Sequence, residues 1–182
     1  MIKTTFFLFM ATCGFSQAKD QEHYKYFATA IDIRNAAIGS APTNNKPALD
    51  LIYQAGIVSH NFEINISYES FNRIHFDKYA IGVGYHFPLY GYVLGKQVKT
   101  VLIPSIEPAM IGRWGTEWQT TSCHLTISGA LSLRWFLTDH LGVELLHTIT
   151  PRVDLYARYP ELHSKVPMIQ SNYLKIIYRI GG

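Results

Sequence analysis

Serine, histidine and glutamate side chains stand close together in two short segments of the chain. Glu161 lies near the adjacent His163 and Ser164, and Ser122 precedes His124 by two positions. A hydroxyl nucleophile beside an imidazole base is the combination with which many hydrolases attack an ester or acyl group. Neighbouring residues of a loop have no fixed geometry, so these side chains are catalytic candidates only if the fold aligns them.

The elements that must position these groups show a regular alternation of apolar and polar residues. The clearest case is residues 61–71, in which Phe62, Ile64, Ile66 and Tyr68 alternate with Glu63, Asn65, Ser67 and Glu69. Successive side chains of a β-strand point to opposite faces, so this segment has one apolar wall and one charged wall. We therefore predict a strand here.

The same pattern predicts eight strands, at residues 24–34, 48–58, 61–71, 77–87, 98–114, 121–136, 141–149 and 171–180. Strands of about 9 to 11 residues match a tilted crossing of a bilayer. Pro104 and Pro108 fall within the fifth strand, and we expect a bulge or a break in the hydrogen-bond ladder there. Bacterial barrels have short periplasmic turns and long outer loops. We expect short turns at 59–61 and 137–140, a longer connection at 88–97, and outer loops at 35–47, 71–76, 115–120 and 151–167.

The first residues are typical of an export signal. Lys3 is followed by an apolar stretch at 6–15 and then by Ser16-Gln17-Ala18, which resembles a cleavage site. We predict a signal peptide at residues 1–18 and a single barrel domain at 19–182. A buried N-terminal strand, or a lipid-modified N-terminus at Cys13, is the alternative.

The composition excludes several classes of site. The chain has 16 lysines and arginines against 13 acids, so no basic patch indicates nucleic acid binding. Cleavage at residue 18 would leave Cys123 as the single thiol, so we expect no internal disulfide. No cysteine and histidine spacing indicates zinc, and we expect no metal and no cofactor.

Charges on the polar wall balance, which suits a confined interior where an unpaired charge costs several kcal/mol. We expect an interior polar network of six acids and six bases: Asp32, Asp50, Glu63, Glu69, Glu107 and Glu144 with Arg34, Lys78, Arg113, Arg134, Lys175 and Arg179. Small residues such as Gly82 and Ala28 on the same wall would let long side chains fill an eight-stranded barrel. The aromatic residues of the apolar wall fit the belts at membrane surfaces. We favour a membrane barrel over a soluble barrel or sandwich.

The export signal, the eight alternating segments and the final Tyr173-Leu-Lys-Ile-Ile-Tyr-Arg-Ile180 strand together resemble small outer-membrane β-barrel proteins of the OmpA/OmpX kind. That family usually ends on an aromatic residue, whereas this chain ends in Gly181-Gly182. The resemblance implies an all-β fold, an eight-stranded antiparallel up-and-down transmembrane barrel. It also implies a location in the outer membrane of a Gram-negative cell. The implied partners are outer-membrane lipids, lipopolysaccharide and the barrel assembly machinery.

We interpret the chain as an integral barrel with a structural or surface-interaction role. Some barrels of this size modify lipid A, so a lipid-A-modifying hydrolase that uses the serine and histidine candidates is the first alternative. A soluble lipocalin-like lipid-binding barrel is the second. Trp114 and Trp118 of the third outer loop are candidates for partner contacts or for anchors at the barrel rim. His86 and His124 fall on the polar wall, where they could titrate near neutral pH, although eight strands leave little room for a water-filled channel.

Overall fold

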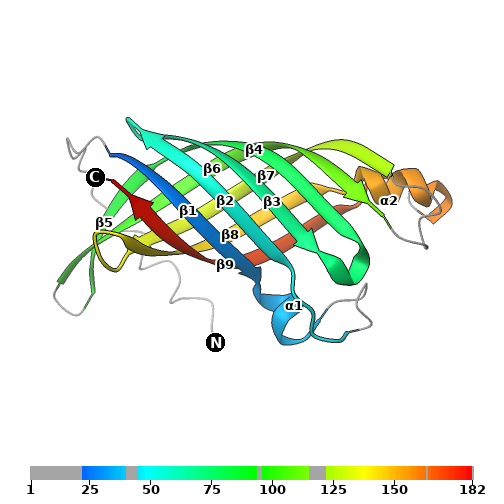
Figure 1. The fold of residues 1–182 in the computed structure, drawn as a ribbon, viewed down its shortest axis with the longest axis horizontal. Coiled ribbons are helices and arrows are strands. Elements are labelled where there is room, and N and C mark those ends of the chain that lie inside the picture. Colours follow the sequence, from blue (N-terminus) through cyan, green and yellow to red (C-terminus); the bar gives the residue numbers. More distant parts are fainter. Residues whose placement is uncertain (1–21, 40–44, 94–95, 115–121, 163, 182) are drawn as a thin grey trace, which may run out of the picture.

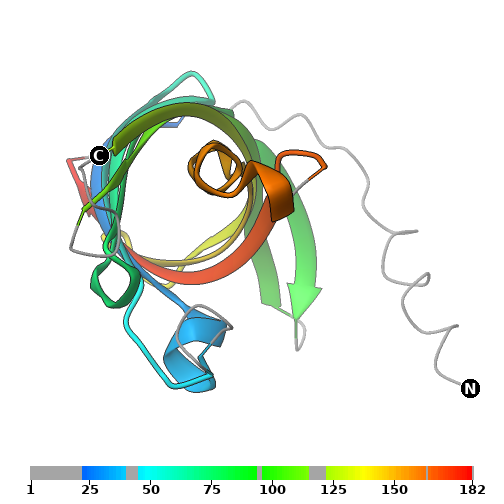
Figure 2. The ribbon, with the colours of Figure 1, turned by 90° about the vertical axis from the view of Figure 1, so that its right-hand side faces the viewer.

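A closed antiparallel barrel is formed by the described part of the chain, which in the computed structural model comprises residues 22–39, 45–93, 96–114, 122–162 and 164–181 (Figure 1). The predicted signal peptide lies outside these residues, as do Trp118 and His163. The strands are β1 (His23–Asp32), β2 (Leu51–Ser59), β3 (Phe62–Phe71), β4 (Phe76–Tyr85), β5 (Phe87–Val93), β6 (Lys96–Arg113), β7 (Ser122–Phe136), β8 (Leu141–Pro151) and β9 (Met168–Ile180). The sheet order is β4-β3-β2-β1-β9-β8-β7-β6-β5, and the pairing of β4 with β6 closes it (Figure 2).

Strands β4 and β5 together form one wall strand. β4 pairs with Ser105–Arg113 of β6, and β5 pairs with Lys96–Leu102 of the same strand. The described sheet is therefore an eight-stranded antiparallel barrel, and the predicted fold class is confirmed. The predicted connection at 88–97 was wrong, because most of it belongs to β5 and to the start of β6. No charged residue occurs in β5, so the alternation that marks the other strands is missing there.

The two ends of the barrel differ in their connections. At one end, which we call the turn end, β2 and β3 are joined by His60 and Asn61, whose positive φ angles of 52° and 66° suit a tight hairpin turn. The short turn between β7 and β8 lies at the same end. The other end, which we call the helix end, carries α1 (Ile33–Ala37), the 3₁₀ turn η2 (Asn72–Ile74), α2 (Val153–Arg158) and η4 (Pro160–Leu162).

Helix α1 shortens the first predicted strand. The carboxylate of Asp32 accepts a hydrogen bond from the backbone N–H of Asn35 at 2.6 Å and so caps the helix. Because the chain turns at Asp32, Arg34 lies on the exposed surface of α1 rather than on the interior wall of the barrel. Among the described residues, no helix is long and apolar enough to cross a membrane.

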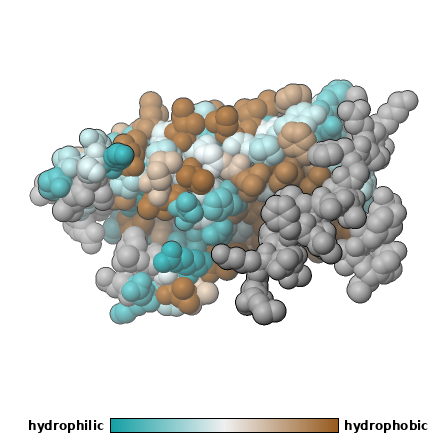
Figure 3. All heavy atoms as spheres, turned by 180° about the vertical axis from the view of Figure 1, so that it is seen from behind, coloured by the Kyte–Doolittle hydropathy of each residue, from teal (hydrophilic) through white to brown (hydrophobic). Residues whose placement is uncertain are grey.

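The apolar wall faces outward and the charged wall faces inward. Ile66 is 62 % exposed and Leu125 is 79 % exposed, whereas Arg134 is fully buried. Figure 3 shows apolar side chains over much of one face of the barrel, with hydrophilic residues at both ends and in a patch near the middle. The alternation thus separates two environments, as it does in a membrane barrel.

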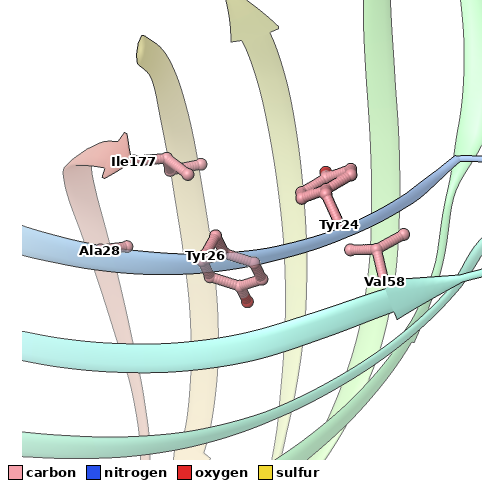
Figure 4. Packing of buried hydrophobic residues seen from close by; sticks show 5 residues of the cluster. All are labelled: Tyr24, Tyr26, Ala28, Val58 and Ile177. Atoms are coloured by element: carbon pink, nitrogen blue, oxygen red, sulfur yellow. The ribbon is translucent and has the colours of Figure 1, made fainter. Parts of the chain in front are cut away.

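A small apolar cluster occupies the interior near the turn end. Tyr24, Tyr26 and Ala28 of β1 lie with Val58 of β2 and Ile177 of β9, all buried (Figure 4). The Tyr26 ring lies against the backbone of Gly56, where an added Cβ would be 2.5 Å from a ring carbon. Glycine at this position therefore makes room for a large interior side chain.

Candidate functional site

Arg134 of β7 is the centre of a buried ionic network in the turn half of the barrel. Its Nε donates to Glu144 of β8 at 2.6 Å, and its Nη2 lies 3.0 Å from Glu63 of β3. Its Nη1 donates to the Tyr24 hydroxyl at 2.9 Å, and its guanidinium lies over the Tyr26 ring. One side chain therefore links strands from opposite sides of the barrel.

The two carboxylates around Arg134 have further partners. Glu63 accepts hydrogen bonds from the Tyr26 hydroxyl and from the Asn65 amide, and its Oε2 lies 2.7 Å from Nε2 of His86. Glu144 accepts from Nζ of Lys175 at 2.7 Å, and the same ammonium donates to Gln54. Buried carboxylates are stabilised when several donors and cations share them, as here.

Glu22, just before β1, extends the network to the turn end. Its carboxylate accepts from Nζ of Lys99 at 2.6 Å and lies 3.6 Å from Nδ1 of His86. Burial alone would raise the pKa of Glu22, but the contacts with His86 and Lys99 outweigh burial and lower that pKa to about 2. Glu22 is therefore ionised at neutral pH.

A second group of charges lies in the helix half of the barrel. Lys78 of β4 forms an ion pair with Glu69 of β3 at 3.1 Å and lies 3.9 Å from Glu107 of β6. The Tyr173 hydroxyl of β9 donates to Glu69 at 3.1 Å. The space lined by Glu69, Lys78 and Glu107 has a volume of about 10 Å³, which is at the lower limit for one water molecule.

Asp32 and Asp50 hold the base of the α1 loop. The side-chain amide of the buried Asn35 donates to Asp50 at 3.1 Å, while its backbone N–H donates to Asp32. Burial, together with the nearby charges of Glu69 and Asp32, raises the pKa of Asp50 to about 8. Asp50 is therefore largely protonated at neutral pH, whereas the sequence pattern predicts an ionised Asp50 in a network with basic residues.

The helix end is covered by α2, which lies inside the ring of strands when the barrel is viewed along its axis (Figure 2). Asp154 of α2 is fully buried, and it accepts from Nε of Arg113 at 2.8 Å and from Nε and Nη2 of Arg152. Both guanidinium groups also lie over the Phe76 ring. Arg152 and Asp154 are not among the residues predicted from the sequence, because they lie in a predicted loop with no strand alternation.

The structure therefore brings most of the twelve expected network residues inside the barrel. The buried ones are Asp32, Asp50, Glu63, Glu69, Lys78, Glu107, Arg113, Arg134, Glu144 and Lys175. Arg34 lies outside, on α1. Arg179 is half-buried at the turn end, where its guanidinium lies 4.1 Å from the Tyr24 ring centre and 3.9 Å from that of Phe136.

The predicted catalytic groups do not form a nucleophile and base pair within the described residues. No hydrogen bond joins Ser122 to His124, and the buried Ser122 hydroxyl has no hydrogen-bond partner among the described residues. Glu161 and Ser164 are exposed, and His163 lies outside the described residues. A serine–histidine hydrogen bond does occur at the turn end, where Ser59 Oγ lies 2.9 Å from Nδ1 of His60, but it lies exposed at the junction of β2 with its turn.

Of the two tryptophans predicted to contact a partner or to anchor the rim, only Trp114 lies within the described residues. Trp114 is half-buried at the end of β6, and its ring meets that of His75 edge-on at 6.1 Å. No group of three or more histidine, cysteine or acidic side chains among the described residues could hold a metal ion.

The fold and its interior place the chain in the class of small closed antiparallel β-barrels with eight strands. No protein-family model matches the chain, and no curated protein matches it. Solved structures that share its fold include the following two. One is the N-terminal β-barrel domain of Pseudomonas aeruginosa OprF, with a TM-score of 0.57 and 10 % identity over 88 % of this chain and 100 % of that domain. The other is Neisserial surface protein A, with a TM-score of 0.51 and 12 % identity over 87 % of this chain and 96 % of that protein. These likenesses confirm the fold that the resemblance to small outer-membrane barrels implied.

Proposed function

We propose that this protein is an integral barrel of a Gram-negative outer membrane, with a structural or surface-interaction role and no conducting pore. The observation that supports this most is the inverted exposure of β3. Ile66 is 62 % exposed on the outer wall, while Glu63 of the same strand is 3 % exposed on the inner wall. Water would disfavour such a surface by about 25 cal/mol for each Å² of exposed apolar area, whereas hydrocarbon favours it.

A closed interior supports the absence of a pore. The ion pairs of Arg134, Lys78 and Arg113 follow one another from the turn end to the helix end. Helix α2 covers the helix end through Asp154. An ion that crossed this interior would have to break paired, buried charges, which is costly.

The helix end supports contact with the anionic headgroups of outer-membrane lipids and lipopolysaccharide. Among the described residues, its exposed charged side chains are mainly basic: Arg34, Lys46, Arg73 and Lys165, with the acidic Glu161. Basic side chains attract phosphate groups, and surface charges of one sign guide such contacts. The outward Ile176, Tyr178 and Ile180 of β9 are the surface that we propose for recognition by the barrel assembly machinery.

Neither alternative gains support from the geometry. A lipid-A-modifying hydrolase needs an aligned nucleophile and base at the membrane surface, and the described residues at the helix end do not supply one. Mass spectra of lipid A from cells with and without the protein would reveal such an activity. A soluble lipid-binding barrel would turn its apolar wall inward, which is the reverse of the arrangement of Ile66 and Glu63.

Two arginine substitutions test the membrane assignment. Ile66 and Leu137 are similarly exposed, at 62 % and 66 %, but Ile66 lies in the middle of the outer wall and Leu137 in a turn. In lipid vesicles, Ile66→Arg should destabilise the barrel by about 2 to 4 kcal/mol and Leu137→Arg by about 0 to 1 kcal/mol. Equal effects in urea unfolding, or recovery of the processed chain as a detergent-free soluble monomer, would refute the proposal.

A further inference from the structure

An apolar groove of about 1100 Å³ runs across the outer surface of the barrel. Two neighbouring rows of outward side chains border it. The first row passes from Phe27 through Ala55 and Ile66 to Ile81, and the second passes from Tyr53 through Tyr68 and Tyr79 to Met110, in each case between directly paired residues. No residue in the lining of the groove carries a charge. The bordering side chains point outward, and all are exposed except Ala55 and Tyr68, which are half-buried. The groove therefore faces the medium around the barrel.

The groove crosses the seam where β4 and β6 close the barrel. Pairing along this seam is interrupted: Ala80 pairs with Ala109 and Val83 with Ile106, but the residues between them are not paired across it. Pro108 lies in this gap and lines the groove. Proline has no N–H to donate, so it leaves the ladder open at this point.

The second row borders the groove on the side of the helix end, and three stacked tyrosine rings form a ladder along it. The rings of Tyr53 and Tyr68 are stacked with 6.5 Å between their centres and 16° between their planes. Those of Tyr68 and Tyr79 are stacked at 4.9 Å and 28°. The Tyr68 hydroxyl donates to Asp77 at 2.8 Å. Tyrosines with one apolar face and one polar tip are typical of the level where hydrocarbon meets headgroups.

We propose that this groove binds one acyl chain of a membrane lipid, with the polar end of that lipid beside the tyrosine ladder and Asp77. The proposal rests on the outer-membrane assignment and makes it more specific, because it distinguishes one site from the rest of the apolar wall. A thin, flexible hydrocarbon chain can follow a groove between two rows of side chains. A second copy of the barrel is less suited, because two convex walls touch on their ridges and leave the floor of a groove uncovered.

Ala55 offers a direct test, because it is the small residue between Phe27 and Ile66 in the first row. A phenylalanine there would fill the groove without adding a charge. Gly129 is the matched control: it is exposed on β7, does not line the groove, and has no atom within 4 Å of an added Cβ. The milder pair Ala55→Leu and Gly129→Leu serves if either phenylalanine variant fails to form the barrel.

The purified full-length mature protein would be titrated with dipalmitoyl phosphatidylethanolamine in detergent micelles and examined by native mass spectrometry. We expect wild type and Gly129→Phe to retain a single lipid, and Ala55→Phe to retain it about tenfold more weakly, equivalent to 1.4 kcal/mol. Equal retention by both variants, no retained lipid in wild type, or a dimer that Ala55→Phe dissociates would overturn the proposal. A failed groove test together with a large Ile66→Arg effect would reject the lipid site and leave the membrane assignment intact.

Discussion

Replacing Arg134 with methionine should test the interior network at its centre. The guanidinium joins Glu144 at 2.6 Å, Glu63 at 3.0 Å and the Tyr24 hydroxyl at 2.9 Å, and the residue is fully buried. Methionine has a similar length and no charge. It would therefore leave two carboxylates that have lost a shared cation while their surroundings stay closed to water.

The expected loss of stability depends on the contacts that the two carboxylates keep. Glu144 keeps Lys175, and Glu63 keeps His86, so neither carboxylate becomes wholly unpaired. Removal of one partner from a buried ion pair generally costs about 3 to 5 kcal/mol. We expect Arg134→Met to fall in that range. Arg134→Lys should be intermediate, because an ammonium retains the charge but cannot make the forked contacts of a guanidinium.

Arg34→Met is the matched control, because the sequence pattern places Arg34 in the same network whereas the structure exposes it on α1. Exposed substitutions away from specific contacts change stability by about 0.5 kcal/mol or less. Urea unfolding in lipid vesicles, followed by tryptophan fluorescence, would compare the variants. A loss of under about 1 kcal/mol for Arg134→Met, or equal losses at both positions, would refute the idea that this network stabilises the barrel.

Three further substitutions probe separate parts of the interior. Gly56→Ala should destabilise the barrel by about 1 to 3 kcal/mol in the same unfolding assay, since its Cβ would meet the buried Tyr26 ring, whereas Gly129→Ala should have almost no effect. Asp154→Asn should expose the α2 loop to trypsin by leaving Arg113 and Arg152 without their shared carboxylate, and the exposed Glu161→Gln should not. The pKa of Asp50 is about 8 in the folded protein, against an ordinary 3.8. Between these values the folded protein holds a proton that the unfolded chain has lost. The contribution of Asp50 to stability should therefore decline as pH rises from about 4 to 8. After correction for intrinsic exchange, the hydrogen-exchange rate of the Asn35 amide should rise over that range in wild type and stay constant in Asp50→Asn. A corrected wild-type rate that follows the variant would contradict this account.

Side-chain alternation predicts most of this fold because it records a single physical contrast, hydrocarbon-like surroundings on one face and paired charges on the other. It predicts β3 almost to the residue. It fails where that contrast is absent. Strand β5 has no charged residue on either face, and the Arg152–Asp154 pair lies in a loop whose conformation depends on contacts with β6.

The ion pairs of the network show which contacts of the site can be predicted from the sequence. Arg134 pairs directly with Glu144, Glu144 with Lys175, and Glu69 with Lys78 in the strand register. Such directly paired residues can be predicted once two adjacent strands and the turn between them are known, because the turn fixes the register. The contact between Glu63 and Arg134 is different, since β3 and β7 are not adjacent and meet across the interior. That contact depends on how many strands close the barrel and how far they are staggered, so alternation can place both residues inside without bringing them together.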